Sequence, residues 1–268
     1  MADIVPSAGA STAAFVGIVP DRVQLVARDP AFDPNDPKSQ AFKFVDFTIP
    51  TAVKTPVLVT KWSQFTRTFG DLVGDPTAPA CAGTPSVDSG YQQLAHAIHG
   101  FFGNGGRRCY VTRITAEFDL DAVLDSFAAV DEIAIVCAPG QIADSVRDKI
   151  VAHCALMKNR FAILDGPQTT TDFDPLARTM ADFTLDTMPK TTDFGAWNHP
   201  WITVFDPGTQ LQDPSGDGSL AVPPSGHLAG IYARVDVERG VFTSSASEPI
   251  RGAMPRRMRL MRATAAQW

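Results

Sequence analysis

The sequence predicts a mixed α/β fold, an α+β arrangement with a partly parallel sheet flanked by helices, long loops and an extended N-terminal arm. Between residues 109 and 164, short apolar runs alternate with segments whose apolar residues recur at helical spacing. That order favours parallel strands, because helices cross over between successive strands. The chain also contains 20 Gly and 21 Pro residues, which predict many turns and long connections.

The first fifth of the chain predicts an arm, a strand and a loop. Residues 1–12 are small and polar without periodicity, which indicates an extended arm. The apolar run at 13–19 predicts a buried strand. Residues 28–50 contain three Asp-Pro steps, and Asp before Pro favours turns and extended backbone, so a surface loop is expected there.

The remaining elements follow from apolar periodicity. Helical spacing predicts a helix that Gly70 ends, followed by three more helices, and short apolar runs predict five strands. Residues 206–226 are rich in Asp, Pro, Gly and Ser, which predicts a second loop. The later helices are expected at 90–102, 120–129 and 142–158, and the strands at 56–60, 109–114, 133–137, 161–164 and 201–205.

Composition narrows the classes of function. The net charge is −6 and the sequence pI is about 5.3, so no nucleic-acid partner is expected. No apolar run approaches the roughly 20 residues that span a bilayer, so no membrane insertion is expected. The four cysteines lack C-x-x-C spacing, and no secretory signal precedes them, which favours a cytoplasmic location.

Motifs that carry chemistry are incomplete in this sequence. The Gly-rich segment Gly103-Asn104-Gly105-Gly106 follows a helix, whereas a phosphate-binding loop precedes one. Ser225 lies in P-S-G and not in G-x-S-x-G. His96 and His99, three residues apart, either share a metal or are ordinary satisfied histidines. Asp165 follows a predicted parallel strand, where α/β folds place ligands, but an Asp before Gly-Pro also forms turns.

Four segments, in order, resemble one family. They are AAFVGIVP with PVLVTKWSQFTRTFG, then LAHAIHGFFGNGGRRCYVTRI, PWITVFDP, and VPPSGHLAGIYARVDVERGVFTSSASEPIRGA. The second and fourth are the most specific. Together they are similar to the tail sheath proteins of contractile phage tails and phage-tail-like, extracellular contractile injection particles.

The resemblance implies a structural protein with no catalytic, cofactor-binding or metal-binding residues. Its partners would be further copies of itself in rings or a helical sheath, an inner tube protein, and baseplate and tail-terminator proteins. The alternatives are a short sheath-derived adaptor or cap that does not contract, and an α/β ligand-binding or hydrolytic enzyme using Asp165. Charges in the two specific segments are candidates for contacts between copies, although ordinary solvation or capping is the alternative. These candidates are Arg107, Arg108, Arg234, Asp236, Glu238 and Arg239.

The resemblance also suggests a division of the chain. Residues 1–20 would be the N-terminal linking arm and first strand, 21–55 a loop insertion, and 56–253 the sheath-type core, with room for two subdomains. Residues 254–268 form a basic tail that matches no family segment, so the family's C-terminal domain is expected to be absent. From Arg251 onward the chain has five Arg residues and no acid, which suits either an acidic partner or a solvated tail.

Overall fold

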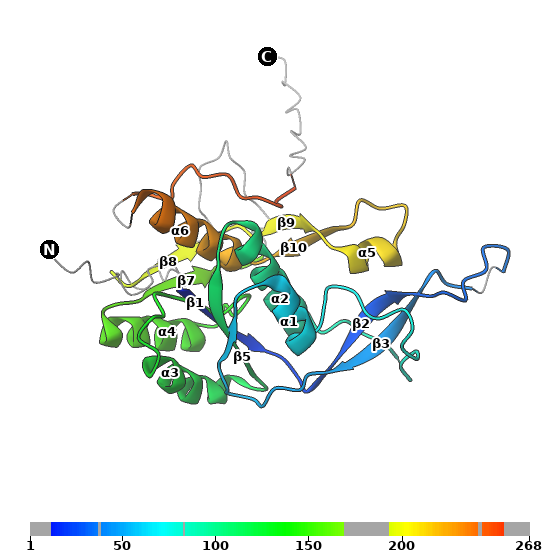
Figure 1. Cartoon of the computed structure of the whole chain (residues 1–268), viewed down its shortest axis with the longest axis horizontal. Coiled ribbons are helices and arrows are strands. Elements are labelled where there is room, and N and C mark those ends of the chain that lie inside the picture. Colours follow the sequence, from blue (N-terminus) through cyan, green and yellow to red (C-terminus); the bar gives the residue numbers. More distant parts are fainter. Residues whose placement is uncertain (1–11, 37–38, 83, 169–192, 241–242, 255–268) are drawn as a thin grey trace, which may run out of the picture.

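A six-stranded sheet forms the centre of the molecule. Figure 1 shows the computed structural model, which describes residues 12–36, 39–82, 84–168, 193–240 and 243–254. Most of the predicted arm and basic tail lie outside these residues. The strand order is β4 (Val57–Val59), β5 (Arg108–Ile114), β1 (Thr12–Ile18), β6 (Ile135–Cys137), β7 (Phe161–Asp165) and β8 (Gly195–Asn198). Only β4 is antiparallel to its neighbour, which confirms the partly parallel α/β prediction.

Helices cover both faces of this sheet. On β1, Ala13 and Phe15 point into one apolar cluster and Ala14 and Val16 into another, and all four are buried. The first cluster includes residues of α1 (Trp62–Phe69), α2 (Ser89–Gly103) and α6 (Ser225–Arg239). The second includes residues of α3 (Leu120–Ala128), which follows the short 3-10 helix η1 (Glu117–Asp119), and α4 (Asp144–Met157). A strand buried on both faces reads as a continuous apolar run, as this one does.

The predicted loop at 28–50, within the expected insertion at 21–55, is largely a β-hairpin. Strands β2 (Arg22–Arg28) and β3 (Phe42–Thr48) pair antiparallel over seven residue pairs. The Asp-Pro steps occupy only the tip between them. The loop prediction fails at residues 42–48, where the Asp-Pro steps outweighed a weaker strand signal. On the partner strand, Val23, Leu25 and Ala27 occur at every second position and pack into the core. In Figure 1 the hairpin projects well beyond the body of the molecule.

The predicted loop at 206–226 is also wrong in part. It contains α5 (Pro207–Gln212) and β10 (Ser219–Val222), which pairs antiparallel with β9 (Ile202–Phe205). The Asp206-Pro207 step begins the helix: the Asp206 carboxylate accepts from the Thr209 backbone N–H, and Pro occupies the first turn. Residues 243–254, which we call the strap, follow α6 and run back over it toward β9 (Figure 1).

Candidate functional site

Helices α2 and α6 approach each other closely because glycines line the contact. An added Cβ on Gly226 would lie 2.4 Å from the Ala97 backbone, and one on Gly230 would lie 2.4 Å from the Phe101 carbonyl oxygen. On α2, a Cβ on Gly100 would lie 2.3 Å from the His227 ring. The two most specific sequence segments therefore meet face to face, although they are more than 100 residues apart.

The first turn of α6 is tied to the sheet by Asp165. This buried carboxylate accepts hydrogen bonds from the Ser225 backbone N–H at 2.9 Å, the Ser225 hydroxyl at 2.7 Å and the Gly140 N–H at 3.1 Å. Burial raises the pKa of Asp165 to about 6, although these hydrogen bonds act in the opposite direction. Its oxygens are thus engaged in joining β7 and the loop after β6 to α6.

Two further histidines lie along the same contact. His227 is buried, and its Nδ1 has no hydrogen-bond partner among the residues that the structure describes. Burial, with smaller contributions from His96 and His99, lowers the pKa of His227 to about 4. His99 lies with its ring edge-on to Trp62, and burial lowers its pKa as well. Protonation of His227 or His99 in acid is therefore unfavourable.

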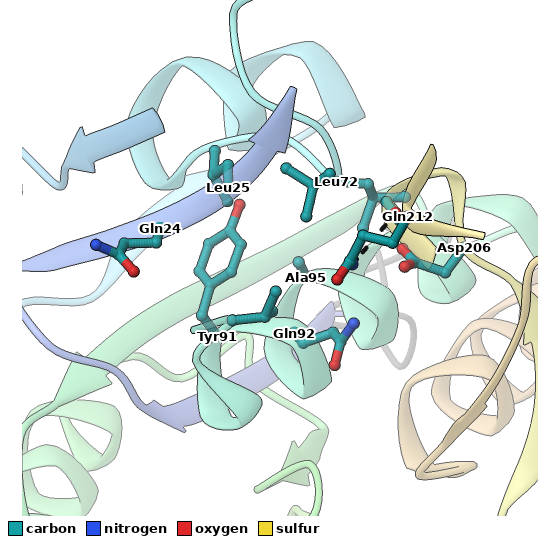
Figure 2. A pocket seen from close by; sticks show the side chains of 11 residues that line it. Gln24, Leu25, Leu72, Tyr91, Gln92, Ala95, Asp206 and Gln212 are labelled. Carbon is teal, nitrogen blue, oxygen red and sulfur yellow. Dashed lines mark hydrogen bonds between the residues drawn. The ribbon is translucent and has the colours of Figure 1, made fainter. Parts of the chain in front are cut away.

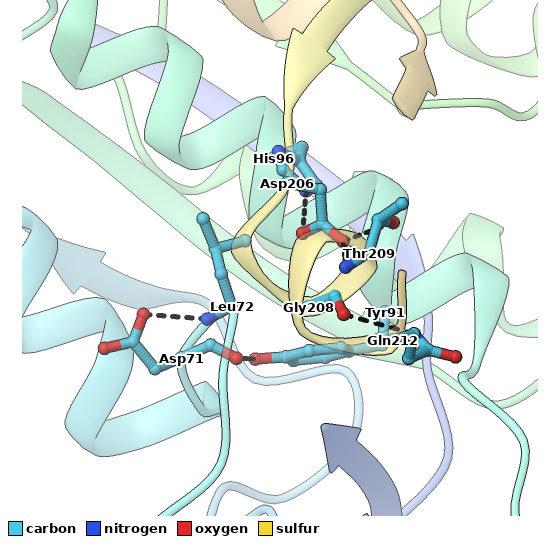
Figure 3. Close-up of polar contacts among 8 residues, drawn as sticks. All are labelled: Asp71, Leu72, Tyr91, His96, Asp206, Gly208, Thr209 and Gln212. Carbon is cyan, nitrogen blue, oxygen red and sulfur yellow. Dashed lines mark hydrogen bonds and ion pairs between the residues drawn. The ribbon is translucent and has the colours of Figure 1, made fainter. Parts of the chain in front are cut away.

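His96 points to a different partner, Asp206, as Figure 3 shows. His96 Nε2 donates to Asp206 Oδ1 over 3.0 Å, and both residues are buried. The other carboxylate oxygen accepts from the Thr209 N–H and hydroxyl. Burial raises the pKa of Asp206, but these hydrogen bonds outweigh it and the net shift is downward. His96 and His99 therefore serve separate contacts, and no metal-capable group of three or more His, Cys, Asp or Glu occurs in the described part of the chain.

The base of the β2–β3 hairpin packs beside the His96–Asp206 pair. Leu25 of β2, Leu72, Tyr91 of α2 and Gln212 of α5 surround a cavity of about 20 Å³ (Figure 2). The Tyr91 hydroxyl donates to the Asp71 carbonyl oxygen over 2.9 Å. Such a volume holds about one water molecule, whereas ligand pockets have several hundred Å³. This junction is thus a packing contact that fixes the base of the projecting hairpin.

The strap is held at the other end of α2 and α6. The Asn104 side chain accepts from the Arg251 N–H at 2.8 Å and donates to the Arg251 carbonyl at 3.1 Å, as a neighbouring strand would. Glu248 pairs with Arg234 at 3.0 Å and with Arg239 at 2.8 Å. Beyond these anchors, an isolated antiparallel bridge joins Ala253 to Val204 of β9.

The six charges singled out in the sequence have different surroundings. Arg107 and Glu238 are exposed. Arg108 pairs with Glu132 at 2.8 Å. Asp236 is half-buried, and burial raises its pKa. The remaining two, Arg234 and Arg239, form ion pairs with Glu248 of the strap, and Arg234 is buried. Their roles between copies stay predictions.

Sequence reasoning missed the residues that hold the strap and the β9–α5–β10 unit. Asn104 was noted only within the Gly-rich segment at 103–106, yet it binds backbone 147 positions away. Asp206 was assigned to a loop, although the Asp-Pro-x-Thr pattern is a recognisable helix start. Glu248 carries no local signal, since its two arginine partners come from a separate helix.

The fold and these contacts define a structural α/β core whose signature residues position surface elements. The model of the phage tail sheath protein central domain matches residues 115–267, more than half of the chain. The chain belongs to this family. The match includes residues 254–267, most of the expected basic tail, and the division of the chain at residue 253 stays a prediction.

Individual relatives agree. A putative prophage major tail sheath protein of Pseudomonas aeruginosa (strain UCBPP-PA14) is 24% identical over 257 residues, covering 89% of this chain and 58% of that protein. The fold is similar to the anti-feeding prophage helical sheath in the contracted state, with a TM-score of 0.51, 19% identity and coverage of 91% and 52%. It is also similar to the sheath of the PVC extracellular contractile injection system in the contracted state, with a TM-score of 0.54 and 18% identity. That match covers 92% of this chain and 51% of the other. The chain spans about half the length of these relatives.

Proposed function

We propose that this protein is a structural subunit of a contractile tail sheath, which polymerises around an inner tube and stores conformational energy for contraction. The observation that carries the proposal is the convergence of the two signature segments on one glycine-lined helix contact. Helix α2 of this contact also packs against the base of the projecting hairpin, and the C-terminal ends of α2 and α6 together hold the strap. A sheath subunit needs such a rigid core, because its copies must keep their own shape while the contacts between them change.

No catalytic or cofactor role forms part of this proposal. The carboxylate best placed for α/β chemistry, Asp165, has its oxygens engaged by Ser225 and Gly140. Among the described residues no helix is long and apolar enough to cross a membrane. The partners proposed are further copies, an inner tube protein, and baseplate and terminator proteins, with assembly into the particle in the cytoplasm.

Polymerisation tests the proposal directly. The purified chain is mixed with its tube protein and studied by electron microscopy and sedimentation. Rings or helical sheaths around tubes are the expected result. Small closed oligomers that cap tube ends would favour the non-contracting adaptor instead. A chain that stays monomeric at high concentration with tubes present would contradict both.

Charge reversal sharpens the test at exposed positions. Arg107 lies in the turn between α2 and β5 and Glu238 lies near the end of α6, and both residues are exposed. We expect R107E and E238R to weaken polymerisation while leaving the monomer folded. K61E is the matched control, because it makes the same change in charge as R107E at another exposed position, before α1. Equal loss in K61E and R107E would indicate a general charge effect and remove Arg107 from the interface.

A further inference from the structure

An apolar groove of about 430 Å³ lies where the end of the strap meets β8, β9 and α6. Its wall includes the rings of Trp197 and Trp201, Pro200 between β8 and β9, and Leu228 of α6. This volume is about twenty times that of the cavity at the hairpin base, and it is within the range of sites that bind ligands. The groove is therefore large enough to receive side chains from a partner.

The polar groups of this wall are engaged within the protein. Trp201 Nε1 donates to the Gly166 carbonyl at 2.8 Å, and His199 Nδ1 donates to the Pro167 carbonyl at 2.9 Å. The His199 ring also stacks on that of Trp197, with 5.8 Å between the ring centroids. The wall therefore offers mainly ring faces, which suit proline and aromatic side chains better than a sugar or an anion.

The tip of the β2–β3 hairpin has the matching chemistry. Residues 29–34 read DPAFDP, in which two prolines flank one phenylalanine. Phe32 is 42% exposed, although phenylalanine is usually buried. The Asp29 carboxylate accepts from the Ala31 N–H at 3.0 Å, and the Asp29 carbonyl accepts from the Phe32 N–H at 3.2 Å. The tip is thus ordered before it meets a partner, and Pro-rich segments are known to dock into grooves lined by aromatic rings.

The charges of the two surfaces are complementary. Asp33 is exposed at the hairpin tip, and Arg251, which follows the groove-lining Ile250, is exposed on the strap. Among the described residues that line the groove, none is acidic. Opposite charges would therefore face each other if the tip entered the groove, and like charges would not.

The tip and the groove lie far apart on one molecule. In Figure 1 the hairpin projects at one end, whereas β8 and α6, which form walls of the groove, lie toward the opposite end. The tip can therefore reach this groove only on another copy of the chain. Such a contact joins two different surfaces, so it can repeat from copy to copy and build a ring or a helix.

We propose that the hairpin tip of one copy inserts Phe32 and its flanking prolines into the groove of the next copy. Asp33 of the first copy then faces Arg251 of the second. The inference rests on the proposed sheath function, because it names two of the surfaces through which copies of the chain meet.

Substitutions at exposed positions test the contact with the full chain and its tube protein. We expect F32S to raise the concentration needed for polymerisation at least about tenfold, because a central aromatic anchor is lost. F118S is the matched control, since Phe118 of η1 is 77% exposed and belongs to neither surface. It should polymerise like the parent. Unchanged thermal unfolding shows that each variant is folded.

Charge reversal tests whether Asp33 and Arg251 meet directly. D33R and R251E should each weaken polymerisation. In the double variant D33R/R251E every copy again presents opposite charges at the contact, so most of the loss should be recovered. Losses that simply add in the double variant would show that the two residues do not face each other, and would overturn the proposed docking.

Crosslinking gives a measurement that does not need a sheath to form. F32C and L228C chains are prepared separately in a C81S background, because Cys81 is only partly buried, and are mixed with a short bismaleimide. The three remaining native thiols are buried, and burial raises their pKa, so they react slowly. We expect the 32–228 product to form at least about fivefold faster than the 118–228 product of an F118C control, because docking raises the effective concentration.

The outcomes separate this inference from the proposed function. Preferential 32–228 crosslinking supports the docking even if no sheath forms around the tube. Sheaths that form equally well from F32S and parent chains would overturn the docking and leave the sheath function standing. Loss of polymerisation in L228D but not in F32S would show that something else fills the groove, and would overturn it too. Equal crosslinking of F32C and F118C to L228C would have the same meaning.

Discussion

The two ends of helix α6 perform different tasks. At its N-terminal end, Ser225 and Gly226 are fully enclosed and bound to the sheet and to α2. At its C-terminal end, Val237 and Arg239 are exposed, and Arg234 and Arg239 pair with Glu248 of the strap. The comparison shows that one helix holds the fold together at one end and a surface element at the other. Changes at the first end should therefore act on the whole fold, and changes at the second end should act locally.

The largest expected effect is that of G226A. The added methyl would lie 2.4 Å from backbone atoms of Ala97, which cannot move aside as a flexible side chain would. We expect a loss of about 3 kcal/mol or more in the free energy of unfolding, measured by chemical denaturation. G103A is the matched control: no atom lies within 4 Å of its added Cβ, and Ala favours a helix by about 0.5–1 kcal/mol over Gly. Similar destabilisation in both variants would contradict the role of close α2–α6 packing.

The next largest effect is a pH dependence of the folding stability that arises from His227. Its pKa is about 4 in the folded chain, against about 6.5 for an exposed imidazole, so the unfolded state binds more protons between these values. Stability from this group is present above pH 6.5 and declines by about 3 kcal/mol as the pH falls to 4. We expect H227Q to lose that decline when unfolding is measured from pH 7 to 4. Parallel profiles for the variant and the parent would contradict this.

Asp165, which binds the same first turn of α6, should give a pH dependence of stability opposite in sign to that of His227. Its folded pKa of about 6 lies above the unfolded value of 3.8, so the folded state binds more protons. Stability from this group is present below pH 3.8 and declines by about 3 kcal/mol as the pH rises to 6. D165N should remove that decline, and its pH profile should differ from the parent in the direction opposite to H227Q. A shift in the same direction for both variants would be inconsistent with this assignment.

A smaller and local effect is expected for N104A at the strap. The substitution leaves the Arg251 N–H and carbonyl without their partner, at a cost of about 2 kcal/mol. Hydrogen exchange should accelerate at least about tenfold in residues 243–254, because each 1.4 kcal/mol corresponds to a factor of ten. Exchange in α2 and α6 should change little. A uniform increase across both helices would indicate that Asn104 supports the whole core.

The smallest effect is expected for R239A. Its pair with Glu248 is 2.8 Å long, but the arginine side chain is 54% exposed, and such pairs contribute about 0.5 kcal/mol. The free energy of unfolding should fall by no more than about 1 kcal/mol. A larger loss would mean that the charges at this end of α6 also hold the fold.

Periodicity alone located most of the core. The runs at 13–19 and 109–114 and the helices at 120–129 and 142–158 were predicted within two or three residues, because buried strands and amphipathic helices leave local apolar patterns. The β2–β3 hairpin and the β9–β10 pair were harder to predict from the sequence. Residues 42–48 and 219–222 lie beside strong turn signals, and their strand character depends on partners elsewhere in the chain.

The sequence by itself determined the α/β class, the α2 and α6 signature segments and their family resemblance, because each is encoded in neighbouring residues. Only the tertiary structure decided what those segments do. Gly226 is required because of the Ala97 backbone, Asn104 binds Arg251, and Asp165 serves Ser225 and not a ligand. These pairs are separated by 60 to 147 positions, and no local pattern records such distances. Contacts of this kind form only after the sheet and its covering helices bring distant segments together.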